Sequence, residues 1–418
     1  MWTSLFAICI LFGSRKCAVK PIIEDKVSID TKSTTENKEF FTDEKSSDDL
    51  NLVVDEATIA FEAGFNLSNA SFVLPTLLEN YVFEKYLDKY KATLGEDTIV
   101  SRKRQFLAKL YIYLLNAVIL KLRNASYSTS LNELTILSPR ETQQLYGFKS
   151  DLPDEKQVEP FLKTPPKIVM GEIPQSLDWR EKDVVGPVLN QGVCGACYAF
   201  CSAGVVEAIA AMQTGIFRSF SMQQIIDCST SFGNLGCAGG TMENSYVYLI
   251  RNGGIGSYQS YPYVGQQERC KNVKSVFNFD ALARIPYGNE EELLSACIRS
   301  PVSVGMDASQ SDFLSYSSGI YDNPRCSSTV LNHAVLLVGF GELTENGKIR
   351  EYWLLKNSWG TSWGEKGYFK LPRNENNFCG VASQASIAYT TSRVGSNIRG
   401  NATLNNETTD FTEEINYK

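Results

Sequence analysis

The sequence predicts an α+β fold in which one buried helix and two apolar strands carry the chemically active residues. Residues 200–212 are rich in Ala, Gly, Val and Ile with a single charge, which is typical of a helix buried on nearly every side. The Leu- and Val-rich run 334–338 and the apolar run 352–355 are typical of buried strands. Helical spacing in 77–92 and in 102–124 predicts two further helices nearer the N-terminus.

Two cysteines lie just before the buried helix. Cys194 and Cys197 are separated only by Gly195 and Ala196, so Cys197 falls at the amino end of the helix. Unpaired N–H groups and the positive end of the helix dipole favour an anion there, and they lower the pKa of a thiol. The pattern therefore indicates that Cys197 is a thiolate nucleophile.

A thiolate nucleophile requires a base, and the chain contains a single histidine. His333 lies at the mouth of the first apolar strand, and Asn357 follows the second. Cysteine, histidine and asparagine are the nucleophile, the base and the group that orients the base in a thiol hydrolase. We therefore interpret Cys197, His333 and Asn357 as one catalytic set.

These residues also match three other kinds of site. Cys194 and Cys197 have the spacing of a redox or zinc pair, but zinc requires two further ligands at knuckle spacing. His333 could be a structural imidazole. Residues 360–364 match the G-x-S-x-G turn of serine hydrolases, in which the histidine follows the serine, whereas His333 precedes it.

The motif Cys194-Gly195-Ala196-Cys197-Tyr198 resembles the C-G-[SA]-C-[WY] signature of the papain family, closest to the cathepsins L, F and O. His333 lies 136 residues and Asn357 160 residues beyond Cys197. Tyr198 stands where most of the family has tryptophan. The resemblance implies a two-lobed papain-like fold, with a helical lobe around Cys197 and a β-barrel-like lobe carrying His333 and Asn357.

The resemblance also assigns the residues that contact a substrate. Gln191, six residues before Cys197, would help to stabilise the oxyanion together with the Cys197 backbone N–H. The segment 236–240 resembles the substrate-binding G-C-x-G-G, and mostly apolar S2 walls favour a hydrophobic P2 residue. The substrate-binding set is Gly239, Gly240, Thr241, Met242, Gly305, Leu331, Ala334, Trp359 and Gln384.

Eleven cysteines are typical of an oxidising compartment. The family's pairing implies disulfides Cys194–Cys237, Cys228–Cys270 and Cys326–Cys379. Cys201 and Cys297 would then remain as buried thiols on helices.

The N-terminal region predicts entry into the secretory pathway. Residues 1–17 contain a short apolar run typical of a signal peptide. Residues 18–75 are polar, and positions 18–56 hold 11 acidic residues against 5 lysines, which predicts disorder. No basic face favours nucleic acid, and no apolar run predicts a transmembrane segment. N-glycosylation sequons occur at Asn66, Asn69, Asn124, Asn401 and Asn406.

The resemblance assigns residues 76–172 to a helical inhibitory propeptide with a linker. Isoleucine and asparagine at 112, 116 and 124 fall at the spacing of the family's propeptide pattern, but the other positions are substituted. Ile136 replaces the acid of the family's N-x-F-x-D element, which leaves the activation trigger open. Residues 173–390 are expected to form the peptidase domain, and 391–418 a polar tail.

These observations predict a secreted or lysosomal cysteine endopeptidase, made as a zymogen and acting on peptide bonds without a cofactor or metal. Its expected partners are peptide or protein substrates, its own propeptide and cystatin-like inhibitors, and it is expected to be a monomer. One alternative is a catalytically weak homologue that serves as a binding or regulatory module. A second alternative is a disulfide-stapled structural protein, for which the single histidine would be incidental.

Overall fold

The computed structural model describes residues 76–90, 95–150, 155–164, 173–345 and 347–391, with Val54, Thr58 and Leu74. The chain divides into two units, 1–93 and 94–418, each of which is described by itself. In the first, helix α3 (Thr76–Tyr90) corresponds to the helix expected over 77–92. The signal peptide, nearly all of the acidic segment, the C-terminal tail beyond Thr391, and Asn66, Asn69, Asn401 and Asn406 lie outside the described residues.

The second unit is built on a seven-stranded antiparallel sheet in the order β3-β9-β4-β6-β7-β8, with β2 paired to β6. Its longest pairing joins β6 and β7, and a bulge at Leu337/Gly339 shifts the register. The strands are β2 (Leu177–Asp178), β3 (Ala281–Arg284), β4 (Val302–Met306), β6 (His333–Glu345), β7 (Lys348–Lys356), β8 (Tyr368–Pro372) and β9 (Ala385–Tyr389).

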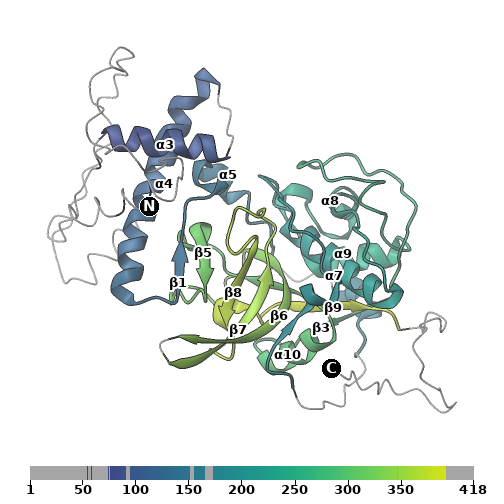
Figure 1. Ribbon diagram of the computed structural model, residues 1–418. Helices are drawn as coiled ribbons and strands as arrows, with labels where there is room; N and C mark the ends of the chain where they lie inside the picture. Colours follow the sequence, from purple (N-terminus) through teal and green to yellow (C-terminus); the bar gives the residue numbers. More distant parts are fainter. Residues whose placement is uncertain are drawn as a thin grey trace. The chain divides into compact units, whose positions relative to one another are not determined.

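Helices α7, α8 and α9 gather on one side of this unit, and strands β5 to β8 lie on the other (Figure 1). The α-helices are α7 (Cys197–Thr214), α8 (Met222–Cys228), α9 (Met242–Arg251) and α10 (Glu290–Arg299). Short 3₁₀ turns connect them: η3 (Trp179–Lys182), η4 (Thr230–Phe232), η5 (Gly236–Ala238), η6 (Phe313–Ser315) and η7 (Phe378–Gly380).

Helix α7 is the buried helix that the sequence predicts. Fourteen of its eighteen residues are buried, and it packs against β6, α8 and α9. It ends at Gly215, whose left-handed backbone caps the last turn. The helix therefore holds its first residue, Cys197, at a fixed place between the helices and the sheet.

Residues 95–164, called here the leading segment, precede the sheet and lie in the same unit. The long helix α4 begins earlier than expected, at Glu96 rather than 102, and ends at Arg123. The remaining elements are β1 (Tyr127–Thr129), η1 (Glu133–Ile136), α5 (Pro139–Gln143), α6 (Glu155–Val158) and η2 (Glu159–Phe161).

Helix α4 is the one described helix that is long and apolar enough to cross a membrane by length and composition, over Thr98–Arg123. In the structure it packs against η1 and β1. Its apolar side chains Phe106, Leu110 and Leu114 are fully buried.

The leading segment is attached to the rest of the unit by a second, two-stranded sheet. Strand β1 pairs with β5 (Tyr316–Gly319). Beside this sheet the hydroxyl of Tyr127 donates to the buried carboxylate of Asp312 at 2.5 Å, which also accepts from Tyr321 and Asn323. The pairing of β1 with β5 and the hydrogen bond from Tyr127 to Asp312 join residues almost two hundred positions apart.

Helix α4 is also tied to α5 by an ion pair. Both guanidinium nitrogens of Arg102 donate to Glu141, at 2.5 and 2.8 Å, and Glu141 also accepts the backbone N–H of Ser138 at 2.8 Å. The hydrogen bond from Arg102 is the largest effect that lowers the pKa of Glu141, to about 2. Because the folded pKa lies below the usual 4.5, this stabilisation is fully present above about pH 4.5 and is lost as the pH falls through 2.

We predict that Glu141→Gln weakens the attachment of α5 to α4 by about 1 kcal/mol, because the pair is partly exposed. Amide hydrogen exchange in α5 should become faster in the variant. In the unsubstituted chain, protection of α5 should stay constant between pH 7 and pH 5. A loss of protection in the unsubstituted chain over that range, absent from the variant, would contradict the low pKa of Glu141.

Candidate active site

The pairing of β6 with β7 brings His333 and Asn357 to the same edge of the sheet. His333 is the first residue of β6, and Asn357 directly follows the end of β7. Since the two strands are antiparallel neighbours, the start of one lies beside the end of the other. The His333 Nε2 and the Asn357 Oδ1 are 2.8 Å apart, and both residues are buried.

The hydrogen bonds around Asn357 establish the tautomer of the neutral imidazole. The backbone N–H of Ser358 donates to the same Asn357 atom at 2.8 Å, so this atom is the amide oxygen and an acceptor. The His333 Nε2 must therefore carry the hydrogen. Its Nδ1 has no hydrogen-bond partner among the described residues, so this nitrogen is available to accept a proton.

Trp359 shields this pair from solvent. Its ring lies 4.6 Å from the His333 ring, between centroids, and both side chains are fully buried. Burial lowers the pKa of His333 to about 4, although the hydrogen bond that Nε2–H donates to Asn357 and the nearby Leu145 carbonyl oppose the shift. The imidazole is therefore neutral in this form of the chain at any pH above about 4.

Cys197 is a free, fully buried cysteine at the first turn of α7. Burial raises the pKa of its thiol to about 11, against backbone N–H groups that include those of Ala334 and Gly147. Gly147 belongs to the leading segment, so the burial and part of the hydrogen bonding come from that segment.

Gln191 completes the site. Its buried side-chain amide donates to the carbonyl of Leu145 at 3.1 Å and to that of Cys194 at 2.8 Å. The hydroxyl of Ser358 donates to the Gln191 Oε1 at 2.6 Å and thereby orients the amide. The sequence motifs do not single out Ser358, although its position directly after Asn357 could have indicated it.

Residues 145–150 of the leading segment cross this site, leaving the turn at Leu145 and pairing through their backbone from Gly147 onward. The backbone N–H of Phe148 donates to the Asn332 carbonyl at 3.1 Å, and Gly240 exchanges hydrogen bonds with Gly147 and Lys149 at 2.9 and 3.0 Å. A Cβ at Gly147 would lie 1.9 Å from the Gly195 carbonyl oxygen, so only glycine fits there.

Phe148 occupies an apolar pocket beside the site. It is 5 % exposed, and a Cβ added to Gly305 would lie 2.6 Å from its ring. Tyr146 lies on the other side of Gly147, with its ring edge-on to His333 at 6.5 Å and to Trp359 at 6.2 Å between centroids. The two aromatic side chains, which flank Gly147 in the sequence, therefore contact different parts of the site.

Several of the residues assigned to substrate binding contact the leading segment. Gly239 and Gly240 border Gly147, and the Gln384 amide donates to the Ser150 carbonyl at 2.8 Å. Thr241 instead caps α9, where its hydroxyl accepts from the Asn244 N–H at 3.1 Å. The other apolar members of the set are buried: Met242, Leu331 and Ala334.

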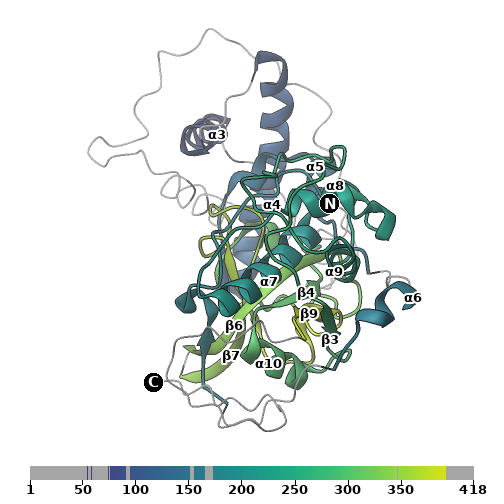
Figure 2. The ribbon, with the colours of Figure 1, turned by 90° about the vertical axis from the view of Figure 1, so that its right-hand side faces the viewer.

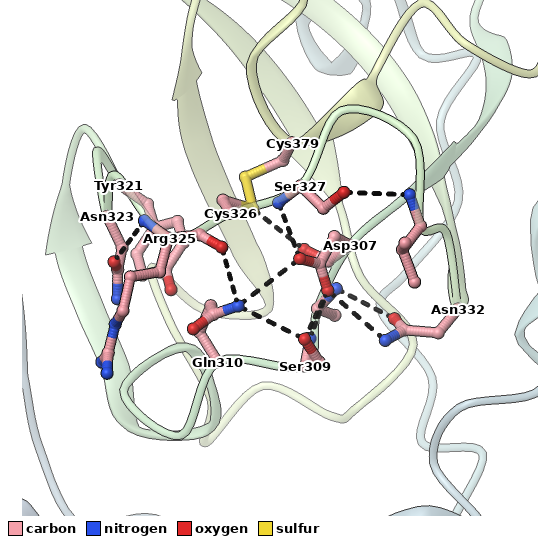
Figure 3. Close-up of a disulfide and its surroundings, with 12 residues drawn as sticks. Asp307, Ser309, Gln310, Tyr321, Asn323, Arg325, Cys326, Ser327, Asn332 and Cys379 are labelled. Carbon is pink, nitrogen blue, oxygen red and sulfur yellow. Dashed lines mark hydrogen bonds between the residues drawn. A yellow bond between two sulfur atoms is a disulfide. The ribbon is translucent and has the colours of Figure 1, made fainter. Parts of the chain in front are cut away.

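A buried carboxylate holds the loop that leads into His333, as Figure 3 shows. Asp307 accepts from the backbone N–H groups of Ser309 and Ser327, at 2.9 and 2.8 Å, and from the Asn332 amide at 3.4 Å. The Asn332 Oδ1 in turn accepts from the Ala308 N–H at 2.9 Å. No sequence motif indicates Asp307, because its partners are spread over positions 309 to 332.

The structure contains three disulfides in the described part of the chain: Cys194–Cys237, Cys228–Cys270 and Cys326–Cys379. Cys201 and Cys297 are free and buried, like Cys197. Cys201 donates to the Val335 carbonyl at 2.9 Å.

The described residues include no cluster of three or more histidine, cysteine or acidic side chains that could hold a metal ion. Asn124, the one sequon asparagine in the described residues, is exposed at the end of α4 with a left-handed backbone.

Comparisons with known proteins place this geometry in a family. The family described as papain family cysteine protease matches residues 173–389. Cathepsin L of Sarcophaga peregrina is 45 % identical over 217 residues, which cover 51 % of this chain and 63 % of that protein. Cysteine proteinase 3 of Dictyostelium discoideum is 45 % identical over 216 residues, which also cover 63 % of its length. Cathepsin S of Bos taurus is 37 % identical over 313 residues, covering 72 % of this chain and 92 % of that protein.

Solved structures extend the similarity into the leading segment. The digestive procathepsin L 3 of Tenebrio molitor larval midgut is 31 % identical with a TM-score of 0.65, and the match covers 75 % of this chain and 99 % of that one. This likeness confirms the predicted α+β papain-like fold with a helical N-terminal region. The chain therefore belongs to the papain family of cysteine proteases and resembles the cathepsins L.

Proposed function

We propose that the chain is the zymogen of a cysteine endopeptidase that hydrolyses peptide bonds through Cys197, His333 and Asn357. One observation carries this proposal: the Asn357 oxygen accepts the Nε2–H of His333, which leaves Nδ1 as the proton acceptor in a site that begins at the α7 terminus. That arrangement is the one a thiol nucleophile requires.

The reaction then proceeds in two steps. His333 Nδ1 takes the Cys197 proton, and the thiolate attacks the carbonyl carbon of the scissile bond. The Gln191 amide, which in the zymogen donates to the Leu145 carbonyl, is placed to donate to the oxyanion together with the Cys197 N–H. His333 returns the proton to the leaving amine, and water hydrolyses the thioester with His333 as the base.

The leading segment accounts for latency. It places a backbone carbonyl on the Gln191 amide, a glycine beside the thiol and Phe148 in the apolar pocket. It also buries Cys197 and His333, and burial disfavours the charged forms of both groups. The thiolate–imidazolium pair is thus unfavourable until the leading segment departs.

Phe148 also indicates the preferred substrate side chain. Gly305 leaves room for the phenyl ring of Phe148, and the apolar residues assigned to S2 are buried. We propose that the mature protease accepts large hydrophobic P2 residues there. Disulfides and cathepsin relatives indicate the secretory pathway, and we propose a lysosomal or extracellular destination.

The central experiment is hydrolysis of a fluorogenic dipeptide after maturation at about pH 5. We predict that Gln191→Ala lowers kcat by about 100- to 1000-fold, because the oxyanion loses one donor. Cys197→Ser should abolish activity. Gln213→Ala is the matched control, since Gln213 donates to Thr390 away from the site. A wild-type protein that is silent while an alkylating agent labels Cys197 would favour a binding module.

We predict that maturation strongly increases the alkylation rate of Cys197. With a thiol pKa of about 11, the thiolate fraction in the zymogen at pH 7 is on the order of one in ten thousand. Iodoacetamide labelling, read by mass spectrometry, should rise at least about 100-fold on removal of the leading segment. Cys201 and Cys297 serve as internal controls, because their burial does not depend on that segment. Equal labelling of Cys197 in both forms would argue against this account of latency.

We predict that Gly305→Ala shifts the preference from large toward small P2 residues. The new methyl group would occupy space that a phenyl ring uses, so kcat/KM for a P2 phenylalanine should fall about tenfold or more. A substrate with P2 valine should lose far less. Equal losses on both substrates would show that Gly305 does not border the P2 side chain.

A further inference from the structure

Beyond the active site, the leading segment docks a second time on the peptidase part. After crossing the site, it forms α6 and η2 beside α9 and β3 (Figure 2). Residues 155–163 make this contact, and we call the part of the peptidase that they cover the β3 surface. It comprises the edge of β3 that faces away from β9, with Arg284, and the neighbouring Arg251 of α9.

Backbone pairing supplies the first contact. In the described part of the chain, β3 is the terminal strand of the sheet and pairs on one side with β9. On its other side Leu162 forms a parallel bridge with Leu282, and the Lys163 N–H donates to the Leu282 carbonyl at 3.1 Å. The leading segment thus covers an edge that could pair with any extended peptide.

An arginine supplies the second contact. Arg284 donates two hydrogen bonds of 2.7 Å to Glu243 of α9, which fixes its guanidinium, and a third of 3.0 Å to Glu155 of the leading segment. Glu243 belongs to the peptidase part and holds the guanidinium of Arg284 by two of its nitrogens. The third nitrogen, Nη1, therefore keeps its orientation when Glu155 leaves.

Apolar packing supplies the third contact. Val158 is fully buried in the common core although it belongs to the leading segment. The Phe161 ring lies under the Arg251 guanidinium, 5.2 Å from its centroid, a cation–π geometry. The β3 surface therefore recognises a carboxylate, an aliphatic side chain and an aromatic ring on one short peptide.

We propose that the β3 surface is a docking site of the mature protease for a protein substrate. It would bind a segment that carries a glutamate, an aliphatic residue and an aromatic residue, as residues 155–163 do in the zymogen. Phe148 lies against Gly305 and the Ser150 carbonyl accepts from Gln384, both residues assigned to S2, and the residues that cover the β3 surface begin five positions after Ser150. A substrate reaches it with residues far to the N-terminal side of P2.

This inference rests on the proposed endopeptidase activity for its biological role, but binding can be tested separately. The probe is a labelled peptide with the sequence of residues 155–164, Glu-Lys-Gln-Val-Glu-Pro-Phe-Leu-Lys-Thr. Fluorescence anisotropy should show that it binds the matured protein. Changing its first Glu to Gln or its Phe to Ala should raise the Kd at least about fivefold, because each change removes one contact.

A matched change at the fifth position, Glu159→Gln, should leave the Kd unchanged, since Glu159 is exposed and has no side-chain partner among the described residues. Arg284→Gln in the protease should weaken binding of the unmodified peptide. The peptide variants leave the protease untouched, so they remain decisive if Arg284→Gln disturbs α9.

Hydrolysis provides the functional readout. A substrate that carries residues 155–164 upstream of its cleavage site, joined by a flexible spacer, should have a KM about tenfold below that of a substrate with the scrambled segment. The free peptide should abolish this difference without changing hydrolysis of the fluorogenic dipeptide. Absence of peptide binding, or equal KM values for the two long substrates, would overturn the docking site. Loss of dipeptide hydrolysis alone would count against the proposed activity.

Discussion

The hydrogen bond between His333 Nε2 and Asn357 Oδ1 is the constraint on which the rest of the site depends. It exists because β6 and β7 are antiparallel neighbours, so the first residue of one strand lies beside the residue that follows the other. It selects the tautomer that leaves Nδ1 free to accept a proton. Trp359 covers the bond, and Ser358 uses both its backbone N–H and its hydroxyl to orient Asn357 and Gln191. One short segment after β7 thus aligns both the base and the oxyanion donor.

The leading segment contacts the groups that are proposed to bind a substrate, but its backbone is not arranged for reaction. Its Leu145 carbonyl accepts from the Gln191 amide, while the residue beside the thiol is Gly147. Burial therefore acts on the nucleophile and the base together, raising one pKa and lowering the other. Burial in this geometry thus disfavours the thiolate and the imidazolium together.

Short motifs allowed much of this to be predicted. The spacing around Cys197 and the single histidine named three residues that the structure places around one site, and the apolar run after Cys197 predicted helix α7. No motif indicates the contacts between distant positions, such as Arg102 with Glu141 or Tyr127 with Asp312. Glu141, whose carboxylate holds α4 through Arg102, lies outside every motif that the sequence analysis uses. Its partner is 39 positions away, so the pattern of nearby residues could not indicate the pair.

The leading segment is attached to the peptidase part on both sides of the site, and both attachments use the edge of a strand. Where the leading segment crosses the site, Leu145 and Phe148 are buried in the core, while Gly147 passes the thiol without a side chain. Its two ends add backbone pairing, because each end pairs with a strand edge: β1 with β5 upstream, and Leu162 with β3 downstream. Each attachment adds a buried side chain and a charged partner, Tyr127 with Asp312 and Val158 with the Glu155–Arg284 pair nearby. Once the segment departs, these edges lose their partners while the groups that recognised it stay fixed by their own domain. The surfaces that keep the zymogen latent are therefore the ones best prepared to bind another polypeptide after maturation.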